Sequence, residues 1–382
     1  MKREHEVGFP TVGEVIHFLY KASGVLPDKR DLSPRIDEKQ RKAVQKALER
    51  LAKEEGNFHD QIGEAIKQLS FFVSGYVNHA AFSLAIGEVI MDLLDVYKHV
   101  IQDEGTYLSK CETLRWMLEE HWAPAAAFSI AKQVTKFGLR PLARYFPEDK
   151  RWYLPDVQDG KQTWPLAKVM YWIYAGTGAS QTQFHYPNRK ADEADNGRER
   201  DLENAQNWIH GRNWPSAAGL DWTFRRAFVA RGPNDTFTTS HQEASYIALF
   251  VTRCISYAAS ALHDAFGKKF LVQFCEKFEQ SFAVALEETR AVEQWIDELA
   301  QQYSMTPFDP SLRSNVVMQW CQELQHRTRL ANAEIQDLYD QGALNTVEVG
   351  RLASIYGAFP VLPAVEQLQN SERRIMPPDF IQ

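Results

Sequence analysis

The stretch that decides the fold runs from Asn204 to Phe228 and reads NAQNWIHGRNWPSAAGLDWTFRRAF. Its first part places apolar residues three and four positions apart, which is the spacing of one face of a helix. Gly211 then stands where a helix needs a residue in the left-handed conformation to stop. Pro215 or Ser216 can open a second helix, because a missing N–H costs nothing in a first helical turn. The sequence therefore predicts a helix, a turn and a helix in this stretch.

Each of the two predicted helices has an apolar and a polar side. The first helix, expected over residues 202–210, gathers on one side Leu202, Ala205 and Ile209, with Trp208 beside them. The second helix carries the apolar residues Leu220, Phe224, Ala227 and Phe228, and turns Arg225 and Arg226 outward. This pattern favours two packed helices whose outer sides meet solvent.

Two short strings in this region resemble the lambda-repressor and Cro-like helix-turn-helix family. The string WIHGRNWPS, from Trp208 to Ser216, resembles the end of that family's reading helix, where a Gly-basic turn is followed by Pro-Ser and an apolar helix. Upstream, GASQTQF from Gly178 to Phe184 resembles the opening of the family's second helix. The resembling region spans residues 164–231, and the segment between its two strings is longer than the family's tight turn. The resemblance implies a small helical bundle that places one helix in the major groove of DNA.

The same resemblance assigns DNA as a partner and gives roles to single residues. Asn207 and His210 would offer an amide and an imidazole to base edges. The full set expected to face DNA is Gln181, Asn204, Gln206, Asn207 and His210, and the set expected near phosphates is Arg212, Arg225 and Arg226. The alternative interpretation of the same residues is a helical hairpin inside a larger helical domain, without a DNA contact.

Length and composition limit the classes of protein that fit. A chain of 382 residues exceeds the size at which single cores stop growing, so two or three domains are expected. We expect an N-terminal helical domain over 1–145, a small helical unit over 164–231 and a C-terminal helical domain over 239–382. The net charge of −7 argues against a general nucleic-acid binder, although residues 204–231 contain four arginines and a single acid.

Heptad spacing dominates the C-terminal half. Gly267 separates two long helices, expected over 239–266 and 268–303, and in both of them apolar residues recur every seven positions. A heptad seam requires a facing seam, so we expect the two helices to pair. The sequence therefore predicts an all-α fold, a multi-helix bundle with a long antiparallel helical hairpin in its C-terminal half. Self-association through residues 240–303, or the docking of another protein there, is the alternative use of this seam.

The sequence also bears on the cellular compartment. The four cysteines, Cys111, Cys254, Cys275 and Cys321, are too widely spaced for a zinc-type pair and fit a reducing environment. The N-terminus is charged and lacks the apolar core of a signal peptide. Because we find no uninterrupted apolar run of about 18 residues, we expect no membrane contact and a cytoplasmic location.

The chain contains none of the common linear catalytic motifs, such as Gly-x-Ser-x-Gly, a phosphate loop or His-Glu-x-x-His. Four residues with side chains that could bind a metal lie on one face of a predicted helix, and they are Glu88, Asp92, Asp95 and His99. This face lies opposite the apolar residues of the helix, so we predict a solvated polar stripe and not a metal site. Acid–histidine neighbours at 119–121, 241–243 and 263–264 are interpreted as polar groups at helix ends. We therefore expect no catalytic residue, no metal and no cofactor.

Tryptophan is concentrated in the middle of the chain. Six of the ten tryptophans fall between residues 152 and 222. This concentration predicts an aromatic core or, alternatively, a ligand-binding surface. The leading hypothesis is a helical binding or regulatory protein that contacts DNA through an embedded helix-turn-helix. One alternative is an enzyme with a pocket in this region and His185, His210 or His241 as acid or base. A dimeric helical scaffold is the other.

Overall fold

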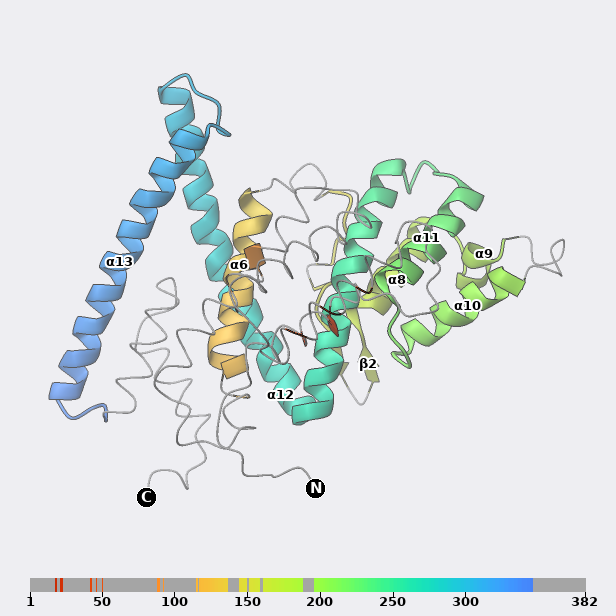
Figure 1. Ribbon diagram of the computed structural model, residues 1–382, viewed down its shortest axis with the longest axis horizontal. Helices are drawn as coiled ribbons and strands as arrows, with labels where there is room; N and C mark the ends of the chain where they lie inside the picture. Colours follow the sequence, from red (N-terminus) through yellow and green to blue (C-terminus); the bar gives the residue numbers. More distant parts are fainter. Residues whose placement is uncertain are drawn as a thin grey trace. The chain divides into compact units, whose positions relative to one another are not determined.

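The computed structural model describes residues 117–136, 144–149, 151–158, 161–187 and 196–345, together with single positions at 18, 21, 22, 42, 46, 50, 88, 89, 92 and 115. Helices dominate these residues, so the all-α prediction is confirmed (Figure 1). Most of the N-terminal helices expected over 1–145 lie outside the described residues. The chain forms two compact units, with Met1–Phe9, Glu88–Gly138 and Glu276–Gln382 in unit 1 and Pro10–Gly87 and Leu139–Cys275 in unit 2.

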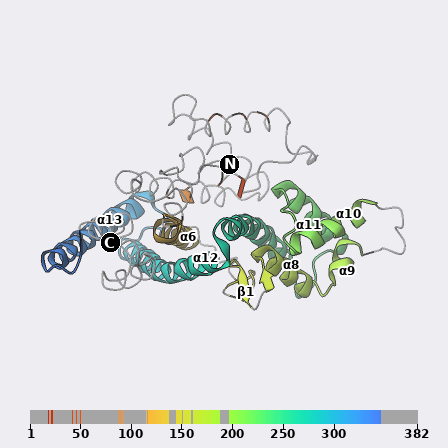
Figure 2. The ribbon, with the colours of Figure 1, turned by 90° about the horizontal axis from the view of Figure 1, so that it is seen from below.

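Unit 2 contains residues Asn204–Phe228, the stretch predicted to form a helix, a turn and a helix. Its helices are α8 (Pro165–Gly176), α9 (Gln181–His185), α10 (Asn196–Ile209), α11 (Ala217–Arg231) and the first part of α12 (Thr239–Gln302). The four shorter helices gather in one group beside α12 (Figure 2). Each of the five helices contributes to one apolar core, whose fully buried members include Leu166, Phe184, Ala205, Phe224 and Ala248. The helix-turn-helix stretch is therefore part of a packed unit and not a separate lobe.

Local signals in the sequence explain where these helices begin and end. α10 ends in a Schellman motif, because Gly211 has a φ of 64° and Arg212 N donates to Asn207 O at 3.0 Å. Gly178 ends α8 in the same way, with the same φ. Ser216 caps α11 by accepting a hydrogen bond from Gly219 N at 3.0 Å. The predicted stop at Gly211 and start at Ser216 are thus confirmed.

One part of unit 2 departs from the all-helical pattern. It contains the short antiparallel strands β1 (Asp156–Gln158) and β2 (Lys161–Thr163). Asp156 pairs with Thr163 and Gln158 with Lys161. In the sequence, the two strands are separated by Asp159-Gly160, a dipeptide typical of hairpin turns.

Among the described helices, α12 is the longest, and its residues belong to both units. Gly267 interrupts it with φ and ψ of 83° and 172°, so the predicted break at this glycine is confirmed. An 18-residue window of α12 has a mean hydropathy of 1.3, which by length and composition alone would suffice to cross a membrane. Half of that window is buried inside the protein.

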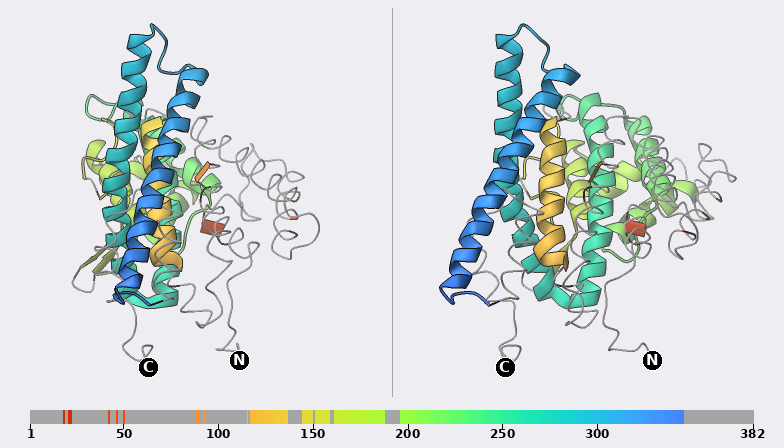
Figure 3. Two further views of the ribbon diagram at one scale, coloured as in Figure 1. Left: turned by 90° about the vertical axis from the view of Figure 1, so that its left-hand side faces the viewer. Right: turned by 60° about the vertical axis from the view of Figure 1, so that its left-hand side comes forward.

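Unit 1 contains the long antiparallel hairpin. The second part of α12 runs beside α13 (Pro310–Asp340), and a short turn joins them (Figure 3). The heptad residues Val292, Ile296 and Ala300 pack against Leu312 and Val316. The facing seam for this part of α12 therefore comes from α13, whereas we had expected it from residues 239–266. The predicted pattern was correct, but heptad spacing does not identify the partner.

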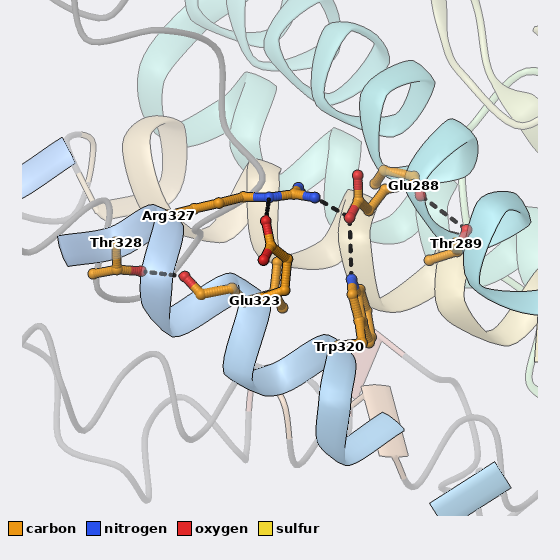
Figure 4. A network of polar contacts seen from close by, with 8 residues as sticks. Glu288, Thr289, Trp320, Glu323, Arg327 and Thr328 are labelled. Atoms are coloured by element: carbon orange, nitrogen blue, oxygen red, sulfur yellow. Dashed lines mark hydrogen bonds and ion pairs between the residues drawn. The ribbon is translucent and has the colours of Figure 1, made fainter. Parts of the chain in front are cut away.

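Polar contacts extend this hairpin beyond its apolar core. Glu288 Oε1 accepts hydrogen bonds from Trp320 Nε1 at 3.1 Å and from Arg327 Nη1 at 3.0 Å (Figure 4). Arg327 Nε also donates to Glu323 Oε1 at 3.3 Å, so one guanidinium joins both helices. The aromatic ring of Trp320 further contacts Phe128 of α6 (Ala123–Lys136), which places α6 against α13 within unit 1.

The polar stripe of residues 88–99 is only partly described, and its described part corrects the prediction of a solvated face. Asp92 accepts hydrogen bonds from Ser129 Oγ at 2.5 Å and from Lys132 Nζ at 2.6 Å. Glu88 accepts one from Gln133 Nε2 at 2.7 Å. Glu88 and Asp92 therefore face α6, which offers them polar partners. Asp95 and His99 lie outside the described residues.

The acid–histidine neighbours before α6 also differ from expectation. Glu119 and His121 lie in a π-helical segment, Met117–Trp122, and both residues are buried instead of capping an exposed helix end. Widening of the helix turns side chains away from the positions that ordinary α-helical spacing predicts, which explains the difference.

Candidate nucleic-acid interface

α10 is the element on which the candidate site is built. Its inner side is fixed, because Leu202, Ala205, Trp208 and Ile209 are buried. Its outer side carries exposed Glu203, Gln206 and His210, with half-buried Asn204 and Asn207 beside them. Four of the five residues expected to face DNA therefore lie on the accessible side of α10. The fifth, Gln181, is half-buried at the start of α9.

The neighbouring helices hold α10 in place. α10 contacts both α8 and α9, and α11 contacts α9. Ser180 opens α9 with a capping box, in which Gln183 N donates to Ser180 Oγ and Ser180 N donates to Gln183 Oε1. α10 is therefore held by two neighbouring helices on its inner side.

The turn after α10 is packed closely against an aromatic side chain. A Cβ atom added to Gly211 would lie 2.4 Å from Trp164 Nε1, so the indole ring lies directly against the glycine backbone. Trp164 in turn packs edge-on against Trp214, with ring centroids 5.6 Å apart. Glycine is therefore required at position 211 for both its positive φ and its lack of a side chain.

The three arginines expected near phosphates differ in their surroundings. Arg212 is exposed, and its Nη1 lies 3.5 Å from Asn207 Oδ1. Arg225 pairs with Asp221 at 2.8 Å and lies over the Tyr246 ring at 4.8 Å. The Asp221 hydrogen bond raises the pKa of Arg225. Only Arg212 has no carboxylate among its contacts in the part of the chain that the structure describes.

Arg226 contributes to the joint between α10 and α11. Its Nη1 lies 3.5 Å from Asp201 Oδ2, and Thr223 Oγ1 donates to Asp201 Oδ1 at 3.4 Å. Asp201 is a buried residue of α10, so it ties that helix to α11 from the inside. Sequence reasoning missed this role because the partners of Asp201 lie more than twenty positions away, and helix periodicity describes only near neighbours.

A buried arginine supports the turn between α10 and α11. Arg253 Nε donates to Pro215 O at 2.8 Å, and its Nη1 donates to Lys21 O at 3.3 Å and to Ala22 O. Burial lowers the pKa of Arg253, and the three carbonyls with the Tyr257 ring compensate its charge. The burial of Arg253 could have been predicted from its position inside the apolar run ALFVTRCISYAA of α12.

The histidines considered for an enzyme lie in different surroundings. His185 is buried, with its Nε2 2.8 Å from Tyr174 Oη. Burial lowers the pKa of His185 to about 3. His241 Nδ1 accepts a hydrogen bond from Thr238 N at 3.2 Å, whereas His210 is exposed at the end of α10. Among the described residues, no group of three or more His, Cys, Asp or Glu is arranged to hold a metal ion.

The tryptophans of residues 152–222 mostly belong to the core. Trp164 and Trp208 are buried, and the partly buried Trp152, Trp172 and Trp214 pack against the unit 2 core. Trp222 is the exception, because 55% of it is exposed on α11. The concentration of tryptophan is therefore explained mainly by packing.

Comparisons with known proteins add no further assignment. No model of a protein family matches the chain, and neither a curated protein nor a solved structure matches it.

Proposed function

We propose that this chain binds double-stranded DNA in a sequence-dependent manner, with α10 as the reading helix, and acts as a regulatory protein. The observation that carries the proposal is the two-sided burial of α10, whose inner side anchors the unit 2 core while its outer side is accessible. A helix of this kind fits a major groove, which is about 12 Å wide. Gln206, Asn207 and His210 supply hydrogen-bonding groups of the types that read base edges.

Charge favours reading of bases over non-specific attraction. The whole chain carries a net charge of −7, and Arg225 and Arg226 lie against Asp221 and Asp201. Non-specific affinity comes from released counterions, so a site with few uncommitted cations binds random DNA weakly. Arg212, at the end of the reading helix, is the principal candidate for a phosphate contact.

The test is selection of duplexes from a randomised pool, followed by fluorescence anisotropy on the selected sequence. Replacing Gln206 and Asn207 by alanine removes base contacts worth about 1–3 kcal/mol each, so affinity should fall at least about tenfold. The variant Arg212→Ala should weaken binding to every sequence similarly and reduce the salt slope by about one. A matched control replaces exposed Gln322 and Gln325, which lie on α13 in unit 1, by alanine.

Two results would contradict this function. In one, the parent protein enriches no sequence from the pool. In the other, the α10 variant binds as tightly as the control variant. Circular dichroism of both variants shows whether a loss of binding reflects unfolding.

A further inference from the structure

The outer side of α10 carries an acidic side chain that the proposed contacts of Gln206, Asn207 and His210 do not use. Glu203 is exposed and lies three, four and seven positions before these residues. The spacing places the four side chains on one face of the helix over two turns, about 10 Å along its axis. With a rise of about 3.4 Å per base pair, this row of side chains spans about three base pairs.

Most side chains of this row are uncommitted. Among the described residues, none forms a hydrogen bond or an ion pair with the side chain of Glu203, Gln206 or His210. Asp201, which belongs to the same helix, is by contrast buried and paired with Arg226 at 3.5 Å. Asp201 therefore holds α10 in place, whereas the carboxylate of Glu203 is available to accept hydrogen bonds from a ligand.

A carboxylate on a DNA-reading face is selective, because the phosphates repel it and only a base-edge donor stabilises it. The donors in the major groove are the N4 amino group of cytosine and the N6 amino group of adenine. The adenine donor lies between two acceptors, adenine N7 and thymine O4, whereas the cytosine donor borders only guanine O6. Cytosine is therefore the base that best fits Glu203.

The amide beside Glu203 fits a different base. The side chain of Gln206 has both donors and an acceptor, which is the combination that pairs with adenine N7 and N6. Gln206 follows Glu203 by three positions, so the two side chains are about 4.5 Å apart along the helix axis. This separation is close to one base-pair step. The two side chains therefore suit two adjacent base pairs.

We propose that Glu203 determines sequence specificity, and that the preferred duplex contains a C·G pair next to an A·T pair. This inference rests on the DNA-binding function proposed above. Glu203 accepts a hydrogen bond from cytosine N4, and Gln206 contacts the adenine of the adjacent pair. On DNA that lacks this cytosine the carboxylate faces only base acceptors and phosphates, so Glu203 also lowers the affinity for random sequences.

Selection from a randomised pool of duplexes tests the proposal with one variant and one control. Glu203→Gln keeps the size of the side chain and removes its charge. The control Glu334→Gln makes the same change in net charge at an exposed position of α13 in unit 1. The parent and the control should enrich a C·G pair next to an A·T pair, whereas Glu203→Gln should keep the A·T pair and lose the C·G pair.

Fluorescence anisotropy measures the size of the effect. Replacing the selected C·G pair by T·A should weaken the binding of the parent and of the control at least about tenfold, but that of Glu203→Gln less than about twofold. On a duplex without the selected site, Glu203→Gln should bind more tightly than the parent, because it lacks the repelled carboxylate. Glu334→Gln should bind that duplex like the parent.

Two results would overturn this inference and leave the DNA-binding function intact. The parent could enrich a sequence without a fixed C·G pair, or Glu203→Gln could keep the full parental preference for cytosine. If the parent enriches no sequence, the DNA-binding function is wrong, and the role of Glu203 is wrong with it. Circular dichroism of both variants should match that of the parent, since both substitutions are at exposed positions.

Discussion

At the scale of single residues, Gly211 and Gly178 form a natural pair for separating two physical effects. Both have a φ of 64° and both end a helix, but only Gly211 lies against a side chain, that of Trp164. Gly178→Ala should cost about 1–2 kcal/mol of folding free energy, because alanine is strained in the left-handed region. Gly211→Ala should cost about 2–4 kcal/mol, because its Cβ atom must also displace the indole.

Urea unfolding of the two variants measures this difference. Equal losses of stability would mean that Trp164 moves aside freely and that the turn after α10 is not rigid. The parent protein and both variants should keep the same far-ultraviolet circular dichroism, since each substitution lies at a helix end and not within a helix.

Residue-level signals also show what could be predicted from the sequence. Gly211 and Ser216 were identified as a stop and a start because capping depends on neighbours within a few positions. The surroundings of Arg226 and Arg253 could not be predicted in this way. Their partners Asp201, Pro215 and Ala22 are brought close only by packing of distant segments. An outward-facing arginine on a helical wheel therefore need not be available to a ligand.

At the scale of elements, the hairpin of α12 and α13 depends on one charged contact near its turn. Arg313 donates to Glu293 at 2.5 Å and to Pro307 O at 3.1 Å, and both charged side chains are mostly shielded from solvent. Arg313→Met should destabilise the protein by about 2–3 kcal/mol, because it leaves the Glu293 carboxylate without this partner. The double variant Arg313→Met, Glu293→Met should recover much of the loss.

A double-mutant cycle on thermal or urea unfolding checks this coupling. If the loss in the double variant equalled the sum of the losses in the two single variants, the two side chains would not be energetically coupled. Arg327→Met is a useful comparison, because its guanidinium is more exposed and its loss should cost less than about 1 kcal/mol.

The helices themselves were largely predictable, while their partners were not. The heptads of residues 268–302 and the break at Gly267 follow from spacing and from one glycine, and both are observed. Spacing does not specify which helix supplies the facing seam, and α13 does so through Leu312 and Val316. The candidate site follows the same rule: the two sides of α10 could be predicted, but its internal attachment through Asp201 could not.

At the scale of the whole molecule, the chain divides into two compact units, and the proposed reading side of α10 belongs to unit 2. α12 contributes to both units, since Ala248 and Leu249 lie in the core of unit 2 and Val292 and Ile296 in that of unit 1. The residues of α12 on the two sides of Gly267 therefore belong to different apolar cores.

Stability of the whole molecule should fall in mild acid because of one buried histidine. His185 lies among Tyr174, Phe184 and Phe224, and burial lowers its pKa to about 3. An unfolded histidine has a pKa of about 6.5, so between these values the unfolded chain binds a proton that the folded chain does not. The stabilising effect of the neutral imidazole is complete above pH 6.5 and declines as the pH falls towards 3.

Between pH 7 and pH 5, protonation of this histidine in the unfolded chain should lower the free energy of unfolding by about 2 kcal/mol. The limiting slope is about 1.4 kcal/mol per pH unit. Urea titrations followed by tryptophan fluorescence measure it, because five tryptophans lie in or against unit 2 packing. His185→Gln should flatten the pH dependence of stability by this amount. If His185→Gln retained the full parental slope, protonation at another position would have to drive the acid unfolding, and the imidazole of His185 would have to accept a proton without opening the core.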